Sequence, residues 1–116
     1  MFIALKHKNL QVYGVIRELV KEVYAVSLLL PSEEKFNMVQ QMRRAALSVK
    51  LNLSEGASRK SVAERNRFLE IARGSVVEID AALETAVDLN YLNINQLQAA
   101  GELLNKVFAM LSNMIE

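Results

Sequence analysis

The sequence predicts an all-α protein that folds as an antiparallel up-down-up-down four-helix bundle. Three observations predict this fold. The 116 residues contain one Pro and four Gly, so few helix breakers interrupt the chain. Apolar residues recur at spacings of three and four over long segments, whereas no segment alternates apolar and polar residues as a strand would. Short connections join four such segments, which places neighbouring helices antiparallel. We expect one domain over residues 1–116, in which residues 1–9 form a short arm.

The first two helices are predicted over residues 10–29 and 32–56. Apolar residues of the first follow a helical spacing, and Pro31 ends it because Pro disfavours helical dihedral angles in the preceding residue. Ser32 is the predicted N-cap of the second helix, since two glutamates follow it in the first turn, where the helix dipole favours negative charge. Gly56 is the expected C-terminal stop.

The last two helices begin at recognisable capping sequences. Ser61 and Glu64 have the spacing of a capping box, in which each side chain accepts a hydrogen bond from the other residue's backbone, and the predicted third helix covers residues 61–89. Asn93 is the predicted cap of the fourth helix, with Gln96 three residues later.

The composition excludes several classes of protein. The chain has no Cys, so disulfides, thiolate metal sites and cysteine nucleophiles are excluded. The N-terminal residues lack an apolar run long enough for a signal peptide. The most apolar run, residues 23–31, falls short of the ~20 residues that a membrane helix requires. We therefore expect a soluble, cytoplasmic protein.

Charge is distributed unevenly along the chain, although the formal net charge is only +1. Residues 40–73 carry eight Lys or Arg and three Glu, whereas residues 74–116 carry one Lys and six Asp or Glu. A basic middle and an acidic end can attract an anionic partner, or can attract copies of the chain to each other. Both alternatives are open from the sequence.

Six basic residues are candidates for contact with nucleic acid, because Lys and Arg side chains neutralise phosphates. Residues one apart on a helix point about 100° apart, so Arg43 and Arg44 face different directions and Arg44 is a candidate for a subunit boundary. Another group surrounds the N-terminus of the third helix, whose dipole also favours anions. The alternative is that Arg43 and Arg44 are solvated or form ion pairs. The candidates are Arg43, Arg44, Lys50, Arg59, Lys60 and Arg65.

A structural polar network between the second and third helices is the other candidate site. We expect Glu55 or Glu78 to pair with Arg43 or Arg44 and to fix how the helices meet, with a catalytic pair of carboxylates as the alternative. Gly74 within the third helix costs ~1 kcal/mol relative to Ala, so we expect close helix contact there, or alternatively a ligand pocket. The predicted network comprises Arg44, Asn52, Glu55, Ser75 and Glu78.

No cofactor, metal site or catalytic residue is predicted. A di-metal site in a bundle needs Glu-x-x-His on two helices, and the single His of this chain, His7, lies outside the predicted helices. No nucleophile–base pair or phosphate-binding loop is recognisable. We therefore expect a protein that is not an enzyme.

Several segments resemble a known family when they are taken together and in order. They are VYAVSLLLPSEEKF at 23–36, QQMRRAALSVKLNLSEGASRKS at 40–61, FLEIARGSVVEID at 68–80 and AVDLNYLN at 86–93. This pattern resembles the bacterial four-helix-bundle proteins encoded in intervening sequences of 23S ribosomal RNA genes. The resemblance covers roughly residues 8–95.

Two departures from the family pattern are mild. Lys50 stands where the family commonly has Pro, and residues 63–66 replace a stretch that usually contains an aromatic residue.

The resemblance implies a ring-like homo-oligomer, a pentamer, with no established enzymatic activity. Its distant relatives include accessory proteins of diversity-generating retroelements, which bind a reverse transcriptase and nucleic acid through a basic surface. Structured RNA, or a nucleic-acid enzyme, is thus the implied partner besides the chain itself. No aromatic residues alternate with the basic ones, so we expect recognition of RNA backbone and shape. The alternative function is a protein-binding or structural module without nucleic acid.

Overall fold

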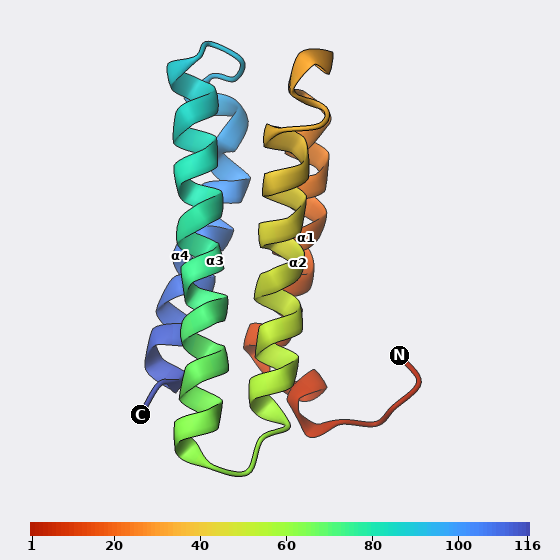
Figure 1. Cartoon of the computed structure of the whole chain (residues 1–116), viewed down its shortest axis with the longest axis vertical. Coiled ribbons are helices and arrows are strands. Elements are labelled where there is room, and N and C mark those ends of the chain that lie inside the picture. Colours follow the sequence, from red (N-terminus) through yellow and green to blue (C-terminus); the bar gives the residue numbers. More distant parts are fainter.

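The computed structural model describes all 116 residues and contains four α-helices and no strand. The helices are α1 (Gln11–Ser27), α2 (Met38–Ala57), α3 (Val62–Asp88) and α4 (Gln98–Met114), with short 3-10 turns η1 (Lys6–Asn9), η2 (Ser32–Glu34) and η3 (Ile94–Leu97). Each helix packs against the next in sequence, and α4 packs back against α1. The chain runs alternately up and down the long axis (Figure 1). The predicted four-helix bundle is confirmed.

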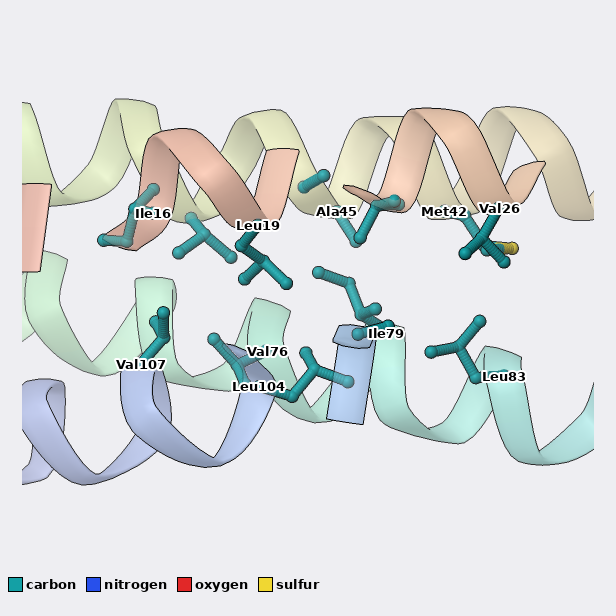
Figure 2. Packing of buried hydrophobic residues seen from close by; sticks show 14 of the residues in the cluster. Ile16, Leu19, Val26, Met42, Ala45, Val76, Ile79, Leu83, Leu104 and Val107 are labelled. Atoms are coloured by element: carbon teal, nitrogen blue, oxygen red, sulfur yellow. The ribbon is translucent and has the colours of Figure 1, made fainter. Parts of the chain in front are cut away.

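One apolar core runs through the bundle and comprises 22 buried residues from all four helices and their connections. Figure 2 shows side chains of α1 and α2, such as Leu19, pointing toward those of α3 and α4, such as Ile79 and Leu104. No buried polar side-chain atom lacks a hydrogen-bond partner. None of the four helices combines the length and the apolar character needed to cross a membrane.

The second helix begins six residues later than the sequence predicts. Ser32 does not cap it; residues 32–34 form η2 and α2 starts at Met38. The Glu34 carboxylate explains the difference, because it accepts hydrogen bonds from Asn37 Nδ2 (3.0 Å) and from the Tyr91 hydroxyl (3.0 Å). These bonds fix the α1–α2 connection against the α3–α4 connection, and Asn37 adopts non-helical dihedral angles there.

Both predicted capping sequences cap a helix start, but only the second forms both bonds of a capping box. Ser61 Oγ accepts a hydrogen bond from the backbone N–H of Glu64 at 3.1 Å, at the start of α3. Asn93 and Gln96 form both bonds of a capping box, which initiates η3 and leads directly into α4. After α3, Asn90 takes a positive φ of 62°, a conformation that Asn tolerates better than most residues.

The two glycines singled out in the sequence have roles other than those expected. Gly56 lies within α2, which continues to Ala57, and a Cβ there would lie 3.0 Å from Phe68 Cβ and 3.3 Å from the Arg65 carbonyl oxygen. It therefore permits close approach of α3 and does not stop the helix. A Cβ at Gly74 would meet nothing within 4 Å, so the close contact expected at that glycine is absent.

We predict opposite effects on stability for alanine at two helical glycines. Gly56→Ala should lower the free energy of unfolding by about 1–3 kcal/mol, because the added methyl group overpacks the α2–α3 contact. Gly14→Ala, the control in open space on α1, should raise it by roughly 0.5–1 kcal/mol through helix propensity. Urea unfolding followed by circular dichroism measures both. Equal stabilisation by both changes would contradict the close packing at Gly56.

Candidate nucleic-acid interface

Three of the predicted basic residues gather at the α2–α3 connection, at the end of the bundle where α1 begins (Figure 1). Arg65 reaches back from α3, and its Nη1 donates hydrogen bonds to the carbonyl oxygens of Arg59 (3.2 Å) and Lys60 (2.7 Å). Its Nη2 also lies 3.8 Å from the Glu116 carboxylate. Arg65 therefore fixes the conformation of the connection that carries the other two cations.

Arg59 forms ion pairs within the chain, whereas Lys60 forms none. The Arg59 guanidinium pairs with Glu55 at 3.0 Å and with Glu64 at 3.8 Å, and it lies 5.0 Å from the centre of the Phe68 ring. Lys60 is exposed and forms no ion pair. Exposed ion pairs such as Arg59–Glu55 contribute little stability, so phosphate can replace the carboxylate as the partner of Arg59.

A second group of cations lies near the N-terminus at the same end of the bundle. Lys8 donates a hydrogen bond to the Ile3 carbonyl oxygen (2.6 Å) and lines a shallow hollow with Glu55 and Ser58 of α2 and its connection. The Lys50 ammonium lies 5.7 Å from the centre of the Tyr13 ring, and Arg17 follows Tyr13 by one turn of α1. Sequence reasoning missed Lys8 and Arg17, because they belong to the arm and to α1, far from the basic middle of the sequence. We call the combined surface the basic end; it comprises Lys8, Arg17, Lys50, Arg59, Lys60, Arg65 and Arg67.

Arg43 and Arg44 lie away from the basic end. Arg43 turns toward α1, where its Nε donates a hydrogen bond to the buried Ser27 Oγ (2.9 Å) and its guanidinium lies 4.8 Å from the centre of the Tyr24 ring. Arg44 is exposed on another face of α2 and forms no ion pair. Arg44 precedes Lys60 by more than three helical turns, roughly 20 Å. The six predicted residues therefore do not form one patch.

A polar contact joins α2 to α3, but its members differ from the predicted set. Ser75 and Ser48 hydroxyls hydrogen-bond at 2.8 Å, and Asn52 Nδ2 donates to the Ser48 hydroxyl at 3.0 Å. Asn52 and Ser75 are thus brought together through Ser48, a residue that sequence reasoning omitted. The small size of both serines suits the closeness of α2 and α3.

The expected ion pair between Glu55 or Glu78 and Arg43 or Arg44 is absent. Glu55 pairs with Arg59 one helical turn along the same surface, which is the nearer cation. Glu78 and Arg44 are both exposed, and neither forms an ion pair. Solvent satisfies these charges, so they do not fix how α2 and α3 meet.

His7 packs into the bundle from the η1 turn, against Tyr13 of α1. The two aromatic rings meet edge to face, with centres 5.4 Å apart, and His7 is buried. Burial lowers the pKa of His7 below its ordinary value of 6.5, and the positive charge of Lys8 lowers it further. No three His, Asp or Glu side chains come together as a metal site would need.

The fold and the clustered cations define a small helical-bundle protein with one basic end. The chain belongs to the 23S rRNA-intervening sequence protein family, whose sequence pattern matches residues 8–113. The resemblance carried by the sequence segments is thereby confirmed, and the match extends into α4, to one residue before its end. No curated protein matches the chain.

We predict that the single His of the chain titrates below its ordinary pKa of 6.5 in the folded protein. The unfolded chain then binds a proton that the folded chain does not, so the stability that the arm adds falls as the pH drops below 6.5. A proton NMR titration of the imidazole resonance measures the midpoint, with the urea-unfolded chain as the reference. A midpoint at or above that of the unfolded chain would show that the arm leaves His7 in solvent.

Proposed function

We propose that the protein is a non-enzymatic, self-assembling bundle that binds structured RNA through its basic end. One observation carries the proposal: cations from the N-terminal arm, α1, α2, the α2–α3 connection and α3 lie toward one end of the molecule. Such a convergence creates a positive potential that attracts a polyanion and makes several phosphate contacts at once. The name of the family, which refers to 23S rRNA, supports ribosomal RNA as the class of RNA.

The aromatic residues near the basic end favour recognition of backbone and shape over base stacking. Arg59 lies over the face of Phe68, and the Lys50 ammonium lies 5.7 Å from the centre of the Tyr13 ring. These aromatic rings are thus already covered by cations of the chain, whereas stacking of single-stranded bases needs free aromatic faces. A folded RNA presents closely spaced phosphates and 2′-hydroxyls, which cations can contact without reading bases.

Self-association is the second half of the proposal, and a pentameric ring in the cytoplasm is the expected form. Large apolar side chains remain exposed along α2, α3 and α4 of the single chain, among them Leu51 and Val77. Exposed apolar residues on the helices of a small bundle favour burial against another protein surface. If RNA binding fails, the same observation favours the alternative function, a protein-interaction or structural module.

We predict that Arg59→Ala combined with Lys60→Ala weakens RNA binding by a similar factor for different RNA sequences. The slope of log affinity against log salt should become less steep by roughly one per lost phosphate contact. Fluorescence anisotropy with a labelled hairpin of 23S ribosomal RNA, between about 50 mM and about 200 mM salt, measures both quantities.

The control is Lys21→Ala combined with Lys35→Ala, which removes the same charge from α1 and from the α1–α2 connection. It should leave binding nearly unchanged, because these lysines lie outside the basic end. An equal loss in both double variants would indicate a response to net charge and would overturn the assignment of the basic end. Absence of binding by the unaltered protein at the lowest salt would overturn RNA binding itself.

A further inference from the structure

Five large apolar side chains at non-terminal positions of the helices are exposed to solvent and do not contribute to the buried core. They are Leu47 (41%), Leu51 (59%), Ile71 (42%), Val77 (52%) and Phe108 (42%). The other exposed large apolar residues lie in the arm, in the connections or at the first position of α3. These five fall on two separate faces of the bundle, which share α3 as their common border.

The first face is the outer side of the α2–α3 pair, which we call the donor face. Ile71 precedes Ser75 by four residues, and Leu51 follows Ser48 by three, so both lie beside the Ser48–Ser75 contact on the helix surfaces. Leu47 and the exposed Arg44 continue this face along α2. Arg44 has no ion-pair partner within the chain.

The second face is a groove between α3 and α4, which we call the acceptor groove. Two adjoining hollows of about 270 and 300 Å³ share Asp80, Gly101 and Leu104. Val77 and Phe108 line one of them, and a Cβ at Gly101 would meet nothing within 4 Å, which leaves the groove open.

Acidic side chains border the acceptor groove on its α3 side. Asp80 borders both hollows, and Glu84 and Asp88 border the second. None of the three forms an ion pair within the chain. The groove therefore combines an apolar floor with unpaired negative charge, which suits a partner surface that is apolar and positively charged.

The two faces carry complementary residues at matching heights along the bundle. Ser48 lies opposite Ser75 in the antiparallel pair, so four residues further along Arg44 is level with Ile79, one residue and about 1.5 Å from Asp80. By the same count Leu47 is level with Val76, next to Val77, and Leu51 is level with Ala72, next to Arg73. The Arg73 guanidinium lies 5.8 Å from the centre of the Phe108 ring. A cation thus lies within one residue of an acid in height, and Leu47 lies within one residue of Val77, so the two faces match with an axial shift of only about 1.5 Å.

We infer that the donor face of one copy binds the acceptor groove of the next copy, with Arg44 opposite Asp80. This inference rests on the self-association proposed above and assigns its two surfaces. Because the surfaces differ, the contact is head-to-tail and generates either a closed ring or a filament. The heights match to within about one residue, so the axial shift between neighbouring copies is small, which favours closure.

In a ring built by this contact, the basic ends of all copies point in the same direction. All copies of a cyclic ring point the same way, so the basic ends gather on one rim, far from the acidic groove. A rim with several equivalent cationic surfaces binds one folded RNA more tightly than a single copy does. Assembly and RNA binding therefore use separate surfaces of the chain.

A charge exchange between the two faces tests the contact. Native mass spectrometry and light scattering should find the unaltered protein as an oligomer, and Arg44→Glu or Asp80→Arg alone as smaller species. The combination of both changes should restore the original mass, since it exchanges the charges while keeping them opposite. Lys21→Glu, an equal charge change on the exposed side of α1, is the control and should leave the mass unchanged. Leu51→Gln should also reduce the mass, without a change in helical content.

The outcomes separate the two proposals. A monomeric unaltered protein would overturn self-association and this contact together. An unaltered oligomer whose mass is insensitive to Arg44→Glu, Asp80→Arg and Leu51→Gln would overturn the assignment of these faces and leave self-association standing. Failure of the combined variant to recover, when each single variant dissociates, would contradict the pairing of Arg44 with Asp80.

Discussion

The close approach of α2 and α3 is the constraint on which the rest of the structure depends. At Gly56 an added methyl carbon would lie only 3.0 Å from Phe68 Cβ, closer than ordinary van der Waals contact, and the Ser48 and Ser75 hydroxyls meet at 2.8 Å. Helices this close can place only small side chains between them. The larger apolar side chains beside the contact, Leu51 and Ile71 among them, consequently lie outside it and remain exposed. Tight packing of this pair is thus the physical origin of the donor face.

The length of α3 converts an uneven charge distribution along the sequence into a separation in space. This helix has 27 residues, which span about 40 Å. Its first half carries Arg65, Arg67 and Arg73, and its second half carries Asp80 and Glu84 among its acids. Since the helix is continuous, the positive and negative segments cannot fold back and neutralise each other. One chain therefore keeps an acidic groove and a basic end available at the same time.

Much of the fold could be predicted from the sequence because it is encoded locally. Helical spacing of apolar residues and the capping sequences at Ser61 and Asn93 identify the bundle and two of its helix starts. The start of α2 depends on Glu34 contacting Tyr91, 57 residues away, and no local pattern contains that contact. The role of Gly56 likewise depends on Phe68 across the pair.

The candidate site was less predictable than the fold. The cluster of Arg59, Lys60 and Arg65 is contiguous in sequence and was identified there. Lys8 and Arg17 reach the same end only through the path of the arm and α1, so sequence order gave no signal for them. Ser48 was missed because the sequence around a helical serine does not indicate which residue of another helix it contacts. The expected ion pairs of Glu55 or Glu78 with Arg43 or Arg44 followed from charge alone. Whether two charges meet depends also on the position of each side chain along its helix and on the direction in which it points, which the sequence does not specify.

Chemical cross-linking between the two faces tests the central claim most directly. The chain has no Cys, so Leu47→Cys combined with Val77→Cys introduces a single reactive pair, and a short bis-maleimide reports whether the two positions meet. The two residues lie on different faces of one bundle. The proposed contact therefore predicts a ladder of covalently linked chains on a denaturing gel, up to the number of copies in the ring. Leu47→Cys combined with Ala25→Cys, on the exposed side of α1, should give no ladder. An oligomer in which the first variant also gives no ladder would contradict the pairing of the donor face with the acceptor groove.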